Sequence, residues 1–375
     1  MNTQYSNKKI NAEVLLVNSL RKILRRHLSY KTLINISNLI NFLIAPPLIA
    51  TIAITQRCNS KCHYCDIWKW QNFIPDPTIE ELKRIFSSLS NLGVKVVSLS
   101  GGEPLLRRDI EEIISIVKNY NIGVQIVTNG ILLSKDRITK LVKAGLDSVV
   151  LSLDTADPEI YQKLRGVPFE IAQWALESLI YVKEKNPRID VAISCVINRY
   201  NIGKLLPLAE KITDISKGKI LINFQSYERV PGRVNDDLIP NPEMYPTLRE
   251  EIEELIKMKK QGFPITNSSI FLRRIPDFLI YNKMPKGFKC SAGYTGVYTW
   301  SDLTLHPCHQ LPAIADLHKK NLEDIWFSSK FRYQRIQMKK AKCRGCLLVC
   351  HTEQALYEWA DRIDKVYQGG GERYE

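Results

Sequence analysis

Residues 48–65 read LIATIAITQRCNSKCHYC, and this stretch decides the fold that we expect. Its first eight residues form a short apolar run of the kind that makes a buried strand. Three cysteines follow directly, with three residues between Cys58 and Cys62 and two between Cys62 and Cys65. In parallel α/β sheets, ligands gather at the carboxyl ends of the strands, so this cysteine pattern lies where a functional site is expected.

Further strand-like runs and helical patterns alternate along the chain. The apolar runs predicted as strands are residues 48–55, 94–100, 123–128, 148–153, 190–197 and 220–225. The helical patterns between them are residues 78–92, 109–120, 134–144, 169–185 and 201–213. Strands that alternate with helices of about ten to fifteen residues indicate βαβ units and a parallel sheet. The six runs predict a partial (β/α)6 barrel resembling a TIM barrel, with an open doubly wound sheet as the alternative.

Changes in composition divide the chain into five predicted segments. They are N-terminal basic amphipathic helices (1–47), the alternating α/β core (48–227), a linker and helical segment (228–284), a small cysteine-rich domain (285–352), and a C-terminal helix and tail (353–375). Clusters of proline and glycine after residue 227 mark the end of the core.

The composition is that of a globular protein rather than a disordered or fibrous one. Of the 375 residues, 45% are hydrophobic and 25% are charged. The sequence has neither an apolar run of about eighteen residues nor a secretory pattern at its N-terminus, so we expect a cytoplasmic protein. Cysteines in that compartment hold metal more often than they form disulfides. Of the nine, Cys195 stands alone in an apolar run and is expected to be a buried core thiol.

The chain is basic, with 53 Lys and Arg residues against 39 Asp and Glu and a net charge of +14. Part of the surplus lies in residues 12–28, which pair an apolar stripe with a basic face, and residues 32–45 are more apolar still. Such helices either lie on an anionic membrane surface, peripheral to the inner membrane face, or pack against the barrel. A generally basic proteome would explain the charge equally well.

Two motifs carry the chemistry of the core. The thiolates of Cys58, Cys62 and Cys65 suit a cubane iron–sulfur cluster and would leave one iron open for a further ligand. Zinc is an alternative, although it prefers four closed ligands, and a coincidental thiol cluster is another. The second motif, Ser100-Gly-Gly-Glu-Pro104, ends the second predicted strand, where two glycines let the backbone turn sharply and approach a ligand.

Together with Thr128-Asn-Gly130, Ser152-Leu-Asp154 and Arg165-Gly166, these motifs resemble the radical S-adenosylmethionine (SAM) superfamily over residues 48–226. The resemblance implies a [4Fe–4S] cluster on the three cysteines, with SAM bound to its fourth iron. It also implies contacts between SAM and six residues. They are Gly101, Gly102 and Glu103 at the amino group, Ser152 at the ribose, Arg165 at the carboxylate and Tyr64 near the adenine.

The remaining cysteines, Cys290, Cys308, Cys343, Cys346 and Cys350, resemble the auxiliary-cluster extension of SPASM and twitch enzymes. A full SPASM domain holds two clusters and needs about seven or eight cysteines. Five therefore imply one auxiliary [4Fe–4S] cluster, held by Cys290, Cys308 and two of the final three. We favour Cys343 and Cys346 over Cys350, with a zinc site as the alternative.

The resemblance implies an enzyme of the oxidoreductase or transferase type that cleaves SAM reductively to a 5′-deoxyadenosyl radical. The radical would take a hydrogen from a small-molecule, polyol, sugar or lipid-linked substrate and give an oxidised or newly bonded product, with electron transfer to the auxiliary cluster. An external one-electron donor of the flavodoxin or ferredoxin type is required. No catalytic residue is assigned.

Two other functions remain open. One is a peptide- or protein-modifying SPASM enzyme, such as a sulfatase-maturing enzyme. Peptide-maturing members often carry an N-terminal winged-helix module of strands and helices, whereas the residues before the first predicted strand here read as helices alone. The other is an RNA-binding iron–sulfur protein, but no RNA-binding motif accompanies the basic charge, so nucleic acid is not the expected partner.

Overall fold

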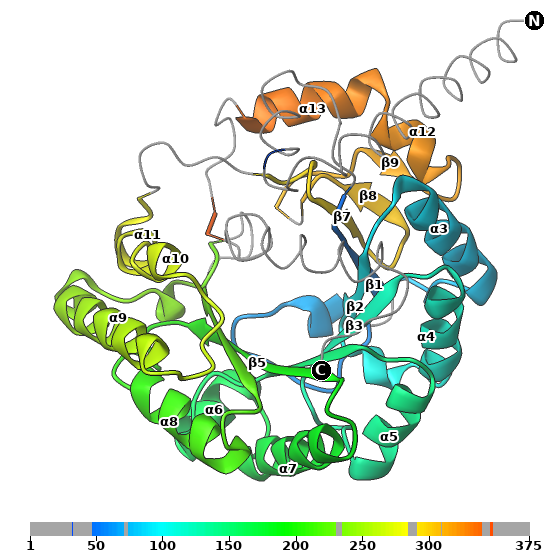
Figure 1. Ribbon diagram of the computed structural model, residues 1–375. Coiled ribbons are helices and arrows are strands. Elements are labelled where there is room, and N and C mark those ends of the chain that lie inside the picture. The colour runs from blue at the N-terminus through cyan, green and yellow to red at the C-terminus, as the bar shows by residue number, and fades with distance from the viewer. Residues whose placement is uncertain are drawn as a thin grey trace, which may run out of the picture.

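A computed structural model describes residues 32, 47–70, 74–229, 235–283, 291–308, 310–339 and 346–347. Within them the chain forms one curved, mostly parallel sheet with helices along its outer face (Figure 1). Apart from Thr32, the helices predicted for residues 12–28 and 32–45 and the predicted C-terminal helix and tail (353–375) fall outside these ranges. In the part of the chain that is described, no helix is long and apolar enough to cross a bilayer.

Six parallel strands follow one another along the chain, as predicted. They are β1 (Ile49–Thr55), β2 (Val96–Gly101), β3 (Gly123–Thr128), β4 (Ser148–Ser152), β5 (Asp190–Ile197) and β6 (Leu221–Ser226). Each strand pairs in parallel with the next one along the chain. The sheet therefore carries the carboxyl ends of all six strands at one edge.

The connecting helices cover one face of this sheet. They are α3 (Ile79–Leu92), α4 (Ile110–Asn119), α5 (Lys135–Lys143), α6 (Pro158–Arg165), α7 (Phe169–Lys185) and α8 (Leu205–Ser216). A doubly wound sheet has helices on both faces, whereas Figure 1 shows these helices around the outside of a curved sheet. The partial barrel is therefore confirmed. Helix α6 was not predicted, although Asp157 caps its backbone N–H groups and Pro158 begins it.

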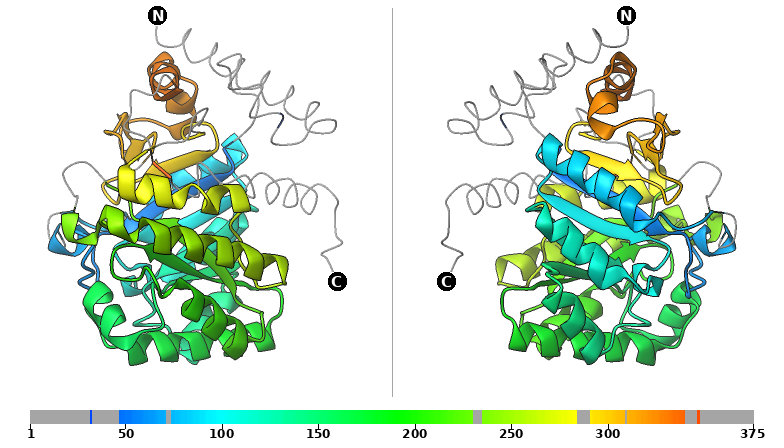
Figure 2. Two further views of the ribbon diagram at one scale, coloured as in Figure 1. Left: turned by 90° about the vertical axis from the view of Figure 1, so that its left-hand side faces the viewer. Right: turned by 90° about the vertical axis from the view of Figure 1, so that its right-hand side faces the viewer.

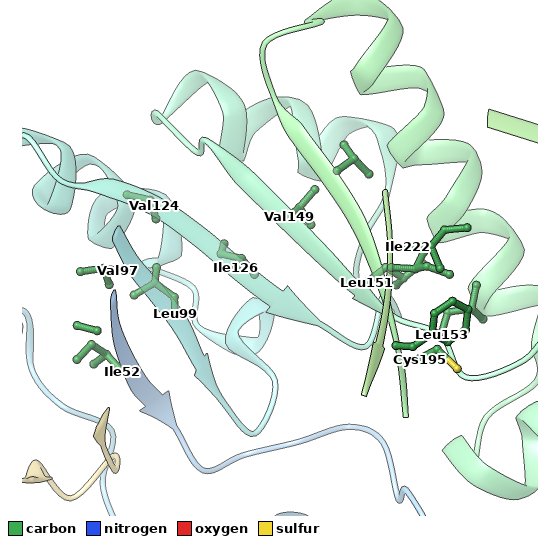
Figure 3. Close-up of a cluster of buried hydrophobic side chains, with 14 of the residues drawn as sticks. Ile52, Val97, Leu99, Val124, Ile126, Val149, Leu151, Leu153, Cys195 and Ile222 are labelled. Carbon is green, nitrogen blue, oxygen red and sulfur yellow. The ribbon is translucent and has the colours of Figure 1, made fainter. Parts of the chain in front are cut away.

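The two faces of the sheet differ in polarity. Every second strand residue faces the helices and is fully buried, as for Ile52, Val149 and Cys195 (Figure 3). The prediction that Cys195 is a core thiol is confirmed. Residues between them form the inner face of the barrel, where Ser152 and Gln225 are only half-buried. The strands therefore hold an apolar core outside the barrel and present polar groups inside it.

Three short strands extend the sheet beyond β1. Strand β7 (Gly296–Thr299) pairs in parallel with β1, and β8 (Thr304–His306) and β9 (Ala315–Asp316) follow in antiparallel order. Strands β7 and β8 form a hairpin that continues the barrel sheet. Helices α12 (Leu322–Trp326) and α13 (Ser329–Lys339) follow.

A helical segment follows β6. Helix α9 (Tyr245–Lys260) lies within the segment predicted as linker and helical (228–284), and two short helices come after it, α10 (Ser269–Leu272) and α11 (Ile275–Tyr281). Residues 222 and 265 form a parallel bridge, so this segment returns alongside β6.

Candidate functional site

The cysteine loop, residues 56–66, leaves the carboxyl end of β1. All three of its cysteines are partly exposed. The backbone N–H of His63 donates to Leu164 O at 2.9 Å, and the Ser60 hydroxyl donates to Arg165 O at 2.6 Å. The loop is therefore anchored on the last turn of α6, about a hundred residues further along the chain.

Polar side chains lie beside two of the sulfur atoms, and that of Asn129 has N–H groups free to donate to one of them. The Ser60 hydroxyl is 3.2 Å from Cys62 Sγ, and Asn129 Nδ2 is 3.9 Å from Cys58 Sγ. Asn129 Nδ2 also donates to Asn59 Oδ1 at 2.8 Å. Hydrogen bonds to cluster sulfurs are one of the means by which proteins tune iron–sulfur centres, so this donor set fits such a group.

Burial disfavours the thiolate form of two of the three cysteines. Burial raises the pKa of Cys58 to about 11 and also raises the pKa of Cys65. A bound cluster would offset this, because metal binding stabilises the thiolate. Among the described residues, no group of three or more His, Cys, Asp or Glu side chains could hold a single metal ion. A cubane cluster has a different requirement, since each thiolate binds its own iron.

Gly101 and Gly102 lie against the backbone at the start of the cysteine loop. A Cβ atom at Gly101, whose φ is +130°, would be 2.1 Å from Thr55 O, and one at Gly102 would be 2.1 Å from Arg57 O. Gly102 N donates to Thr55 O at 2.8 Å, and Glu103 N donates to Arg57 O at 2.7 Å. The two glycines are therefore required for the close approach of two loops, in addition to any approach to a ligand.

The Glu103 side chain is 1% exposed and holds the turn after β3. Its Oε1 accepts from the Thr128 hydroxyl at 2.7 Å and from Leu105 N at 3.1 Å, and its Oε2 accepts from Asn129 N at 2.8 Å. Burial raises the pKa of Glu103 to about 6. Oε2 has one hydrogen bond and keeps a further acceptor site.

A buried polar cluster centres on Asp154, which is completely buried after β4. Its Oδ2 accepts a 2.9 Å hydrogen bond from the Tyr64 hydroxyl and lies 2.7 Å from Arg165 Nε, at ion-pair distance but without the angle of a hydrogen bond. Its Oδ1 accepts from Val196 N at 2.9 Å. The Arg165 guanidinium lies 5.1 Å from the centre of the Tyr64 ring. Asp154 therefore joins the cysteine loop, α6 and β5.

The residues predicted to contact SAM thus lie around one edge of the barrel. Ser152 ends β4 on the inner face, and its hydroxyl has no hydrogen-bond partner among the residues that the structure describes. Arg165 and Tyr64 are instead engaged with Asp154. The individual contacts to SAM remain predictions.

A second group of contacts holds the outside of the cysteine loop. His63 Nε2 lies 2.9 Å from Asp237 Oδ2, and the Tyr200 hydroxyl donates to the same oxygen. Asn235 Nδ2 donates to His63 O at 3.1 Å. In Figure 2 the blue cysteine loop lies at one end of the barrel beside the yellow-green segment that begins at residue 235. The loop after β6 is thereby fastened to the cysteine loop.

The structure describes two of the five predicted auxiliary-cluster cysteines. Cys308 and Cys346 are both buried, with 7% exposure. Cys308 packs with Met338 and with Ala292, two residues beyond Cys290. Cys290, Cys343 and Cys350 lie outside the described residues, so the ligand set of an auxiliary cluster remains a prediction.

Glu228 connects the barrel to both segments that carry these cysteines. Its Oε1 accepts from Leu347 N at 3.0 Å, and its Oε2 accepts from Gln310 Nε2 at 3.1 Å. Burial raises the pKa of Glu228 to about 7. The sequence indicated only that Glu228 follows the last strand. Its partners lie about eighty and about one hundred and twenty residues further along the chain, so no local pattern could identify them.

Comparison with known proteins defines the class of the barrel domain. Residues 52–212 match the family model of the radical SAM superfamily, and they contain the cysteine loop, the Gly101–Gly102 turn and Asp154. This part of the chain is therefore a radical SAM domain.

Two curated relatives extend the similarity over most of the chain. A GTP 3′,8-cyclase of Aquifex aeolicus is 29% identical over 81% of this chain and 97% of its own length. A PqqA peptide cyclase of Rhizobium meliloti is 25% identical over 81% of this chain and 80% of its own.

Solved structures share the fold. SuiB of Streptococcus suis, bound to its precursor peptide SuiA, has a TM-score of 0.63 at 20% identity over 79% of this chain and 68% of that chain. Native anSMEcpe with bound AdoMet has a TM-score of 0.61 at 17% identity over 86% and 97%.

Proposed function

We propose that the protein is a radical SAM enzyme that abstracts a hydrogen atom from a polar substrate held against the inner face of its barrel. The main support for the proposal is that the cysteine loop contacts the Gly101–Gly102 turn at the carboxyl ends of β1 and β2. Both lie within the domain that matches the radical SAM family model.

Cys58, Cys62 and Cys65 would hold a [4Fe–4S] cluster whose open iron binds SAM. When bound, the cluster and SAM supply one-electron cleavage of the sulfonium S–C5′ bond and a 5′-deoxyadenosyl radical. The residues of the chain position these groups. The Asn129 amide donates towards Cys58 Sγ, Ser60 fixes the loop on α6 through Arg165 O, and the Asp154 cluster keeps the loop in place.

The inner face suits a substrate with hydrogen-bonding groups. Ser98 Oγ lies 3.1 Å from Gln125 Oε1, and Gln125 Nε2 lies 3.3 Å from Ser148 Oγ. Nearer the carboxyl edge, Gln225 Nε2 donates to Ser194 Oγ at 2.8 Å. Small hydroxyl and amide side chains of this kind bind sugars, polyols or the head group of a lipid-linked substrate, because they can exchange partners with a polar ligand.

A peptide is the alternative substrate. Both curated relatives are named as cyclases, one acting on a peptide and the other on GTP. These names favour a reaction that forms a new bond within one substrate. The hydrogen-bonding inner face is compatible with either substrate class.

An auxiliary cluster on Cys290, Cys308, Cys343 and Cys346 would accept the electron that the substrate gives up. Glu228 supports this arrangement, since it links the end of β6 to Gln310 and Leu347, which neighbour two of these cysteines.

The proposal is tested by SAM cleavage in the anaerobically reconstituted protein. With dithionite as reductant, we expect release of 5′-deoxyadenosine, and its loss on replacement of Cys58, Cys62 or Cys65 by alanine. Cys195→Ala is the matched control, because it removes a thiol that lies in the core. Cleavage that survives loss of all three loop thiols would refute the proposal.

A further inference from the structure

Basic side chains surround the exposed side of the cysteine loop. Lys61 and Lys69 belong to the loop and to the 3-10 helix η1 (Ile67–Trp70), Lys163 lies on α6, and Arg199 follows β5, all of them exposed. They come together because the loop is anchored on the end of α6, where a Cβ atom at Gly166 would be only 3.0 Å from Lys61 O. We call these four residues the basic patch.

Carboxylates neutralise only part of the patch. Asp66 pairs with Lys69 at 2.5 Å. Asp237 lies 4.0 Å from Arg199 NH1 and also binds His63 and Tyr200. Four cations thus face two carboxylates.

Lys61 and Lys163 have aromatic partners instead. Lys61 Nζ is 5.9 Å from the centre of the Trp68 ring, and Lys163 Nζ is 3.8 Å from that of Tyr200. Neither lysine has a carboxylate within ion-pair distance among the described residues. The patch therefore combines aromatic surface with more positive charge than its two carboxylates balance.

We infer that the basic patch is the docking surface for the acidic one-electron donor of this enzyme. The inference rests on the proposed function, since it supposes that a cluster is bound by the loop. A donor seated on Lys61 and Lys163 would lie directly outside Cys62, which follows Lys61 in the sequence. Redox partners form small, transient interfaces in which complementary charge sets the association rate, and the patch suits an acidic protein of that kind.

Charge reversal at the patch tests the inference. In the cluster-loaded protein, Lys61→Glu/Lys163→Glu should slow cluster reduction by reduced flavodoxin at low salt by about tenfold or more. Reduction is followed by stopped-flow absorbance, and SAM cleavage is measured in parallel. Rates with dithionite, which needs no docking site, should stay unchanged. Added salt should lower the wild-type rate towards that of the variant.

The matched control is Lys185→Glu/Lys260→Glu, which reverses the same number of charges on the exposed last turns of α7 and α9. Because Lys61 adjoins Cys62, Lys163→Glu alone and the iron content of each variant separate docking from damage to the cluster. An equal fall in the rate of cluster reduction by flavodoxin in the control would show that only net charge matters, and it would overturn the inference. So would a flavodoxin rate that resists charge reversal, or a fall in the dithionite rate of Lys163→Glu.

The two proposals fail in different ways. If flavodoxin reduces the bound cluster at a rate that depends on the patch but no SAM is cleaved with either reductant, the proposed SAM chemistry fails and the docking surface stands. If dithionite drives SAM cleavage and charge reversal leaves the rate of cluster reduction by flavodoxin unchanged, the docking inference fails and the enzyme stands.

Discussion

The hydroxyl of Tyr64 donates a 2.9 Å hydrogen bond to Asp154 Oδ2 and thereby joins the cysteine loop to the end of β4. The same carboxylate pairs with Arg165, whose backbone oxygen accepts from Ser60. The position of the proposed cluster ligands therefore depends on one buried ion pair.

We expect Asp154→Asn to lower the free energy of unfolding by about 3 kcal/mol, because it leaves the charge of Arg165 buried without its partner. Tyr64→Phe should cost about 1 kcal/mol, the usual value of one hydrogen bond. Urea unfolding measures both. Asp214→Asn, at the exposed end of α8, is the control. If Asp154→Asn lowers the free energy of unfolding no more than the control does, the prediction is contradicted.

Gly101→Ala should disrupt the packing between β1 and the Gly-Gly turn. The added Cβ would lie 2.1 Å from Thr55 O, so the backbone must move. We expect the free energy of unfolding to fall by at least about 2 kcal/mol, together with reduced iron binding. Gly262→Ala is the control: its φ of +101° is also unfavourable for alanine, but nothing lies within 4 Å. Similar losses for the two variants would show that backbone conformation, rather than close approach, is the cause.

The reconstituted protein should contain about eight iron atoms per chain, four in each of two clusters. Replacing Cys58, Cys62 and Cys65 together should leave about half of this iron, because the two sites share no ligand. Iron analysis with Cys195→Ala as reference measures the difference. A content near twelve would mean that further residues bind a third cluster.

Glu228→Gln should change the pH dependence of stability. Since burial raises the pKa of Glu228 from 4.5 to about 7, the folded state holds its proton more tightly than the unfolded state, and wild-type stability falls as pH rises through this window. Glutamine does not ionise. The free energy of unfolding of the variant, relative to that of the wild type, should therefore rise by up to about 3 kcal/mol between pH 4.5 and pH 8. Urea unfolding across this range, with Glu210→Gln on α8 as control, tests this. A difference in unfolding free energy between variant and wild type that does not change with pH would contradict the prediction.

The sequence predicted the six parallel strands to within two residues at each end, because each strand has a local apolar signal. It also pointed to the motif that contains Asn129, but not to the contact of that side chain with Cys58. The link between Glu228 and Leu347 and the pairing of β7 with β1 were likewise missed. Each of these depends on residues far apart in the chain, which no local period or spacing records.

The parallel pairing of β7 with β1 has a consequence for electron transfer. One strand, β1, ends in the cysteine loop, and its neighbour leads through β8 to Cys308. One hydrogen-bonded sheet thus links the cysteine loop to the segment that carries Cys308, so these two segments cannot separate without breaking its strand pairing. If both proposed clusters are bound, this sheet would set the distance over which an electron tunnels from the Cys308 side of the barrel to the cysteine loop.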